Sequence, residues 1–409
     1  MNVITSSANR PYASNLMLKK LPLFVRHTFY HDLKAGMLFG IFGGAFLPFI
    51  AIVGRKIGAT EFQIAFFISA PYVANAFAIF WTEDIFGKGR VWYTVWSNVT
   101  GRAVLFAMLF VSSPFNYTII IFLYMLVTAI AFPSYASVMK TNYPERERGR
   151  LMGYIRIGTA CLWIPSSMAS GWILEKGTEN YHYIFPFAAI FGILSAIEFG
   201  HIKVRREGKK KEGLAAFSHI TAPLKNMPFR TFLITYSIFE FGLLLSLPLY
   251  PLIQVDRAHI PNLVAGVFGT IFSGTWLIGF FFWGRFIDKH PLSSLLSLLF
   301  LVSATIPFIY LLTYNLWFLS IAQGILGFIS SAIELIGYVV ITRMASPKET
   351  PRYMALHILL GGFRGATAPF LGPMILNSIG VETAFGISIA FMVSALIFVN
   401  RYRSVSLFK

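Results

Sequence analysis

Twelve apolar segments of similar length follow one another along this chain of 409 residues. A helix needs roughly 20 predominantly apolar residues to cross a bilayer, and only helices and closed barrels satisfy every backbone polar group in lipid. Each segment is long enough, so the sequence predicts twelve transmembrane helices. They are expected at residues 33–53, 62–82, 92–113, 117–138, 150–174, 182–202, 229–253, 262–283, 292–312, 315–342, 352–377 and 381–400.

The composition agrees with a lipid environment. Hydrophobic residues make up 56% of the chain and charged residues only 12%, a balance that is too apolar for a soluble protein of this size. We therefore expect an all-α membrane protein whose main partner is the lipid bilayer.

Basic residues mark one side of the membrane. If both termini are cytoplasmic, the cytoplasmic segments hold most of the 34 Lys and Arg residues, and the outer loops hold only Arg55, Lys56, Lys176 and Arg257. The positive-inside rule then predicts a multi-pass protein of the plasma (cell inner) membrane with both termini cytoplasmic. Basic loops beside anionic lipid headgroups account for the net charge of +17, so no nucleic-acid partner is expected.

One short pattern occurs once in each half of the chain. Residues 84–90 read Asp-Ile-Phe-Gly-Lys-Gly-Arg after the second span, and residues 284–290 read Gly-Arg-Phe-Ile-Asp-Lys-His after the eighth. Such duplication is typical of transporters built from repeated bundles. The most charge-dense stretch lies between the halves. The expected division is a cytoplasmic segment 1–32, six-helix bundles at 33–202 and 229–400 joined by a cytoplasmic basic linker 203–228, and a cytoplasmic tail 401–409.

In layout and in this repeated pattern the chain resembles the major facilitator superfamily (MFS) of secondary transporters, over essentially its whole length. The matching residues are Asp84, Gly87, Lys88 and Arg90 in the first half and Gly284, Asp288 and Lys289 in the second. Phe80 stands where the family has its first Gly, and His290 breaks the second copy. The resemblance implies two pseudo-symmetric six-helix bundles, and gating loops at these residues that hold the cytoplasmic side shut.

Several kinds of chemistry leave no trace in the sequence. It contains no Gly-rich loop ending in Gly-Lys and Ser or Thr, which would cradle nucleotide phosphates, and no His or Cys pattern with metal-ligand spacing. A Gly-x-Ser-x-Gly turn for a serine nucleophile is also missing. We therefore expect no enzyme, no cofactor and no metal, and transport driven by a gradient rather than by ATP.

Charged residues inside the predicted spans are the strongest functional candidates, because a charge at the bilayer centre costs about 2.5–3.5 kcal/mol on insertion scales. Such residues should face protein or a wet cavity. They are Glu240, Glu334, Arg102, Arg156 and Arg364.

Polar residues share a helix face with the two glutamates. They are Gln323, Ser330 and Tyr338 for Glu334, and Tyr236 for Glu240. The resemblance implies that both glutamates lie on helices that line a central cavity. A carboxyl group there is pulled toward its neutral form by burial and toward its ionised form by a nearby Arg, which suits a proton carrier. Proton coupling or substrate contact is the first interpretation for Glu240 and Glu334, and fixed ion pairs are the alternative. For Arg364 an internal ion pair is the first interpretation, and a role in ligand binding or proton coupling is the alternative.

Further polar residues in the spans are weaker candidates for the cavity or a gate. They are Arg102, Arg156, Asn98, Tyr124, Thr128 and His357. Three arginines against two glutamates leave a positive excess, which favours an anionic solute.

The sequence thus predicts a secondary active transporter that works by alternating access, is coupled to protons and moves a small organic, anionic solute as a monomer. Export of lipophilic drugs or lipids is an alternative. A transport-inactive membrane receptor or scaffold is a second alternative of another class, because fold alone does not fix function.

Overall fold

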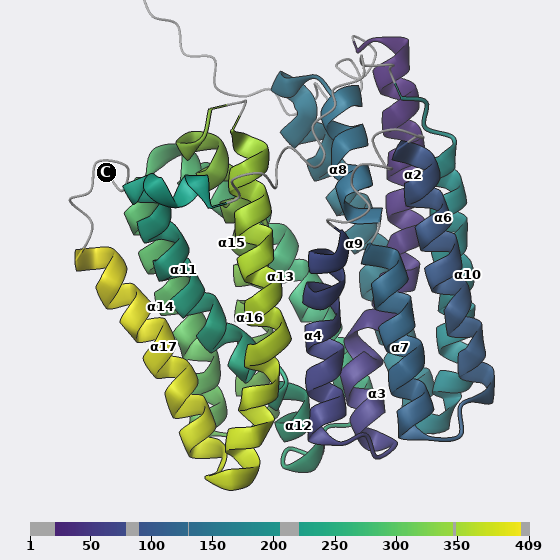
Figure 1. Ribbon diagram of the computed structural model, residues 1–409. Helices are drawn as coiled ribbons and strands as arrows, with labels where there is room; N and C mark the ends of the chain where they lie inside the picture. The colour runs from purple at the N-terminus through teal and green to yellow at the C-terminus, as the bar shows by residue number, and fades with distance from the viewer. Residues whose placement is uncertain (1–20, 79–89, 130, 205–220, 347–348, 402–409) are drawn as a thin grey trace, which may run out of the picture.

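The computed structural model describes residues 21–78, 90–129, 131–204, 221–346 and 349–401, and in these ranges all regular structure is helical. The helices form twelve spans arranged as one bundle (Figure 1). Eight of the described helices are long and apolar enough to cross a membrane. The all-α fold class predicted from the sequence is confirmed.

The first six spans lie on one side of the bundle. They are α2 (Leu23–Phe46) with η1 (Leu47–Phe49) and α3 (Ile50–Lys56), α4 (Glu61–Ala78), α6 (Arg90–Ala103) with η3 (Val104–Phe110), α7 (Pro114–Ala129) with α8 (Ala131–Asn142), α9 (Glu145–Glu175) and α10 (Tyr181–Gly200). The short η4 (Thr178–Asn180) precedes α10. We call these spans the N-half.

The last six spans form the C-half on the other side of the bundle (Figure 1). They are α11 (Met227–Ser246) with α12 (Leu249–Asp256), α13 (Asn262–Lys289), α14 (Leu292–Leu312), α15 (Leu316–Met344), α16 (Thr350–Ser378) and α17 (Val381–Arg401). The short η6 (Ala222–Lys225) precedes α11. Because the number of spans is even, α2 begins and α17 ends at the same end of the bundle.

Two helices are longer than the hydropathy pattern predicts. The first span begins at Leu23 rather than at residue 33, since Val25 and Phe29 bury an apolar face beside the more polar residues around them. The eighth span continues to Lys289, so Gly284, Asp288 and Lys289, expected in a loop, lie in the last turns of α13. Trp283 and the buried Ile287 give these turns an apolar face to pack, which explains why the helix continues.

The first and seventh spans are interrupted at equivalent places. Pro48 stands in η1 between α2 and α3, and Pro248 stands between α11 and α12. A proline inside a helix removes a backbone hydrogen bond and kinks the chain. Both spans therefore bend shortly before the end of the bundle that carries Arg55 and Asp256, which we call the Arg55 end.

Small residues let helices approach closely, within the N-half and between the halves. Gly40 and Gly44 of α2 lie against the backbone of α9, where a Cβ atom would collide. Gly266 of α13 lies against the carbonyl of Ser167 in α9 and beside Gly171. The first contact joins helices of the N-half, and the second joins the halves.

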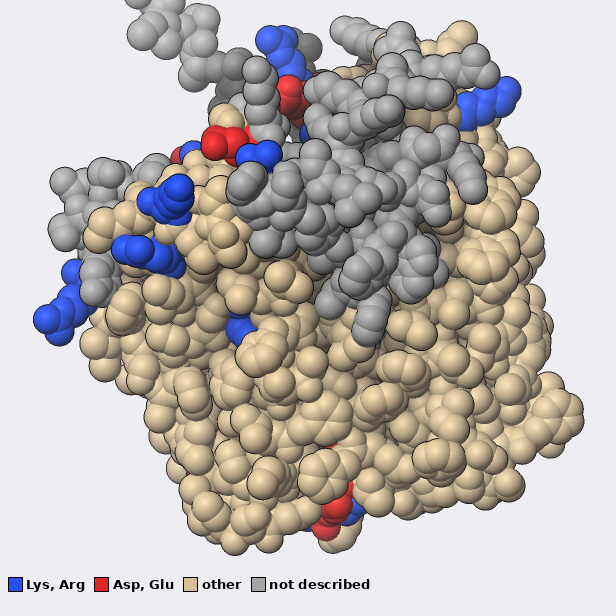
Figure 2. Space-filling model, in the orientation of Figure 1, with Lys and Arg blue, Asp and Glu red and all other residues tan. Residues whose placement is uncertain are grey.

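Charged residues gather at one end of the bundle. Figure 2 shows lysines and arginines together with acidic residues at the end where α2 begins, and below them a broad surface that is uncharged apart from small patches. A small mixed-charge group lies at the opposite end. The uncharged surface is what a lipid-facing belt requires.

Candidate functional site

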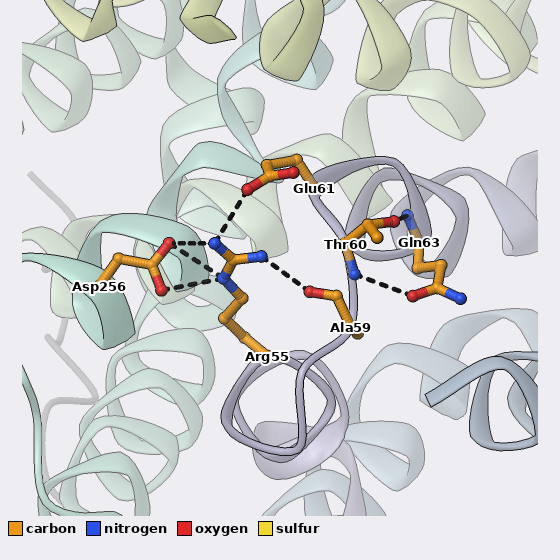
Figure 3. A network of polar contacts seen from close by, with 6 residues as sticks. All are labelled: Arg55, Ala59, Thr60, Glu61, Gln63 and Asp256. Carbon is orange, nitrogen blue, oxygen red and sulfur yellow. Dashed lines mark hydrogen bonds and ion pairs between the residues drawn. The ribbon is translucent and has the colours of Figure 1, made fainter. Parts of the chain in front are cut away.

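An arginine joins the two halves at the Arg55 end (Figure 3). Arg55 Nε donates to both carboxylate oxygens of Asp256 at 2.9 Å, and Nη2 lies 2.8 Å from Oδ2. Within the N-half the same guanidinium donates to Ala59 O at 2.8 Å and to Glu61 Oε1 at 2.9 Å. Residues of the N-half thus orient the Arg55 guanidinium, and the Asp256 carboxylate of the C-half accepts its hydrogen bonds.

Further hydrogen bonds between α9 and α13 continue this contact into the bundle. Asn262 Nδ2 donates to Leu174 O at 2.8 Å, and Ser167 Oγ donates to Gly266 O at 2.9 Å. Both bonds use a side chain of one half and a backbone carbonyl of the other. Together with the Arg55–Asp256 pair they hold the halves closed at this end.

A second ion pair joins the halves deeper in the bundle. Arg156 Nη2 of α9 lies 2.6 Å from Glu334 Oε1 of α15. Both residues lie about 15 Å from the helix ends opposite the Arg55 end. The guanidinium also lies over the rings of Trp276 and Phe280, at 4.8 and 5.6 Å. The side chains keep 30% and 42% of their surface exposed, so the surrounding protein does not enclose this pair.

A buried aspartate, Asp32 of α2, lies near the same arginine. It is 2% exposed, and Tyr143 donates a hydrogen bond to its Oδ2 at 2.9 Å. The Arg156 guanidinium attracts this carboxylate. Arg156 therefore interacts electrostatically with an acid of the N-half and forms an ion pair with an acid of the C-half.

The other two predicted charges form a buried pair inside the C-half. Arg364 Nε of α16 donates to Glu240 Oε2 of α11 at 2.8 Å, and Nη1 donates to Ser237 Oγ at 2.6 Å. The Tyr236 ring centroid lies 6.0 Å from the guanidinium carbon. The side chains of Arg364 and Glu240 are only 5% and 10% exposed, so this pair is far less open to water than Arg156–Glu334.

Two rings flank the buried pair. Tyr72 of α4 lies directly against Gly365, where any side chain would collide with it, and so brings the N-half up to Arg364. On the C-half side His357 packs 5.5 Å from the ring of Tyr236. Within the described residues His357 Nδ1 has no hydrogen-bond partner.

Several polar residues predicted for the cavity make hydrogen bonds within their own helices or contact a neighbouring helix. Asn98, Thr128 and Ser330 each donate to a backbone carbonyl one turn earlier. Gln323 donates to the Tyr310 hydroxyl at 3.4 Å, and Tyr124 is buried among Phe42 and Phe46. Tyr338 lies in α15, and its side chain is outside the described part of the structure.

Arg102 lies apart from the other charges. Its Nη1 donates to Gly192 O of α10, and its guanidinium lies over Phe39 and Phe42 at 5.4 and 5.0 Å. This arginine is buried inside the N-half, so the geometry ties α6 to α10. Of the other repeated-pattern residues, Asp84, Gly87 and Lys88 lie outside the described residues, and Arg90 begins α6.

Sequence reasoning missed Asp32, Arg55 and Asp256 as site residues. Asp32 falls before the hydropathy window of the first span, and Arg55 was counted only as an outer-loop charge. A repeated sequence pattern could have identified Arg55 and Asp256. Leu47-Pro48 and Leu247-Pro248 repeat at equivalent places, and Arg55 and Asp256 follow them at nearly equal spacing with opposite charge.

A twelve-span helical bundle in two halves, with ion pairs across their boundary, defines a membrane transporter rather than an enzyme. The sequence profile of the Major Facilitator Superfamily matches residues 35–291 and 232–407. The chain therefore belongs to the Major Facilitator Superfamily. A comparison with curated protein sequences gives no match.

Solved transporter structures share the fold at low sequence identity. The nucleoside transporter NupG is 11% identical with a TM-score of 0.67, covering 95% of this chain and 100% of that one. An inward-facing, unoccupied bacterial homologue of the human lysosomal transporter Spinster is 13% identical with a TM-score of 0.62, covering 93% and 96%. The human organic anion transporter MFSD10 is 12% identical with a TM-score of 0.63, covering 93% and 100%.

Proposed function

We propose that this chain is a proton-coupled secondary transporter that moves a small organic solute by alternating access. The observation that supports this most is the Arg156–Glu334 pair, which joins the halves while its side chains stay 30% and 42% exposed. A carboxylate that takes up a proton loses its attraction for the arginine. Protonation of Glu334 would therefore release one connection between the halves.

Glu334 is a better proton site than Glu240 because of water access. A proton carrier has to exchange with water, and Glu240 is closed in by Arg364 with only 10% of its side chain exposed. When Glu334 is neutral, Arg156 still has the carboxylate of Asp32 nearby. The arginine can thus pass from one acid to the other, and the proton on Glu334 sets which acid it favours.

The charges inside the spans no longer favour an anionic solute. The expectation of an anion counted Arg102, Arg156 and Arg364 against two glutamates, and the buried Asp32 supplies a third acid. The names of the similar structures do not decide the matter, since they include a nucleoside transporter and an organic anion transporter. We therefore keep the proposal at a small organic solute.

The orientation proposed from the sequence makes this conformation closed on the side away from the cytoplasm. The basic end of the bundle would face the cytoplasm, and the Arg55 end, where the halves are bound together, would face outward. In a Cys161→Ser background, a cysteine at Arg257 should react with an impermeant reagent on intact cells, and one at Arg401 should not. Labelling of position 401 from outside would reverse the orientation.

A transport assay separates the roles. Solutes that raise the melting temperature of the purified protein in a metabolite screen would be tested for flux in vesicles. Glu334→Gln keeps shape and hydrogen bonding but cannot ionise, so it should exchange solute across the membrane without accumulating it in a pH gradient. Glu382→Gln, the same change at an exposed position of α17, should accumulate solute normally.

The outcomes distinguish the alternatives. Accumulation by Glu334→Gln at the level of the unmodified protein would show that this carboxyl does not carry the coupling proton. If the unmodified protein transports no solute of the screen, the result would favour a transport-inactive receptor or scaffold over a transporter. Flux confined to lipophilic compounds would favour the exporter.

A further inference from the structure

Three histidines surround one glutamate where the first span begins and the sixth span ends. His27 and His31 lie one turn apart on α2, and Glu198 and His201 lie at the end of α10. His31 Nδ1 lies 2.8 Å from Glu198 Oε1, and His201 Nδ1 lies 3.7 Å from Glu198 Oε2. The group belongs to neither ion pair of the transport proposal.

The spacing of these atoms fits a metal ion. One ligand atom from each of His31, Glu198 and His201 lies within 4.8 Å of the other two. Zinc binds imidazole nitrogen and carboxylate oxygen at about 2.0–2.2 Å, which places tetrahedral ligand atoms about 3.4 Å apart. Side-chain rotations that move these atoms by about 1 Å would bring them to that separation.

The surroundings provide a fourth position and an access path. The ring of His27 lies 4.4 Å from that of His31, on the same face of α2. His201 is 58% exposed at its side chain, whereas His31 and Glu198 are 17% and 19% exposed. Packing therefore holds His31 and Glu198 in place, and His201 is the ligand that is most accessible to solvent.

One electrostatic feature suits a cation. The group lies at the C-terminal end of α10, where unpaired carbonyls carry partial negative charge. Lys34 opposes it, because Lys34 Nζ lies 3.8 Å from Glu198 Oε1, the oxygen to which His31 also donates, so this lysine competes with a metal ion. The histidines are not needed to join the helices, because Ser195 Oγ already donates to Ala35 O at 2.8 Å.

We propose that His31, Glu198 and His201 bind a divalent ion of the zinc type, with His27 or water as the fourth ligand. Binding at Nδ1 of His31 requires the ring to carry its proton on Nε2, so the metal ion would replace the hydrogen bond between His31 and Glu198. The bound ion would fix the start of the first span to the end of the sixth, directly before the chain enters the linker.

Spectroscopy of the full chain tests this without knowledge of a transported solute. With any purification tag removed, Co²⁺ should give the intense visible absorption of a four-coordinate site, and Zn²⁺ should abolish it. His31→Ala and His201→Ala should lose this absorption and bind Zn²⁺ about 100-fold or more weakly, since loss of an outer-shell partner alone costs about 10–100-fold.

Two control variants test the assignment. His182→Ala changes a histidine at the other end of α10, whose Nδ1 contacts Met108 O, and Lys34→Gln removes the competing cation. Both should keep the Co²⁺ spectrum. A six-coordinate Co²⁺ spectrum in the unmodified chain would overturn the proposal without any variant. It would also be overturned if His31→Ala and His201→Ala bound Zn²⁺ as tightly as the unmodified chain does.

Discussion

Asp256→Asn should loosen the closed Arg55 end. The substitution removes the negative charge that receives Arg55 across the halves, while Ala59 and Glu61 still hold the guanidinium in the N-half. Hydrogen bonds to charged groups are worth about 1.5–3 kcal/mol. The Arg55 and Asp256 side chains are 21% and 39% exposed, and exposed ion pairs are worth about 0.2–1 kcal/mol.

We therefore expect a loss of about 1 kcal/mol from the closed state, which corresponds to about fivefold more of the open one. A cysteine at Ile260, which is 1% exposed and whose carbonyl accepts a hydrogen bond from Lys56 across the halves, would report this population in a Cys161→Ser background. Its alkylation rate in nanodiscs tracks the open fraction when closing is faster than the reaction. Asp256→Asn should raise that rate about fivefold.

The matched control is Glu61→Gln. It removes the same charge from the same arginine, but Glu61 and Arg55 both belong to the N-half. Its alkylation rate should stay near that of the parent. If both variants accelerate alkylation equally, or Asp256→Asn changes nothing, the Arg55–Asp256 pair does not hold the halves together.

Two further predictions concern the buried ion pair of the C-half and the close contact between the halves. Arg364→Met leaves Glu240 buried without its partner and should cost about 3–5 kcal/mol of stability, so the double variant with Glu240→Gln should melt at a higher temperature than Arg364→Met alone. An equal or lower melting temperature would show that the pair is not energetically coupled. Gly266→Leu places a side chain against the Ser167 carbonyl and should also raise the alkylation rate, whereas Gly274→Leu, where nothing lies within 4 Å of a Cβ atom, should not.

The sequence predicted the spans well because their signal is local. Length and hydropathy are properties of each segment by itself, and most boundaries agree to within a few residues. The error at the first span has a physical cause. His27, His31 and the buried Asp32 lower the hydropathy of a helix that also buries Val25 and Phe29, so a window that averages over all these residues misses its beginning.

The pairing of charges could not be read in the same way. Periodicity identified Glu334 and Arg156 as charges inside spans, but their contact joins residues 178 positions apart and depends on how the halves meet. The same holds for Arg55 and Asp256, which are 201 positions apart. Functional roles for Glu240, Glu334 and Arg364 stay predictions until transport is measured.

The close contact of α9 and α13 at Gly266 determines how far the rest of α13 can swing. Because Gly266 has no side chain, the two backbones approach closely there, and rotation about this point would displace few atoms. The helix extends about 35 Å from Gly266 to Lys289. Each 10° of tilt would therefore move the basic end of α13 by about 6 Å, a large opening produced by a contact that itself hardly shifts.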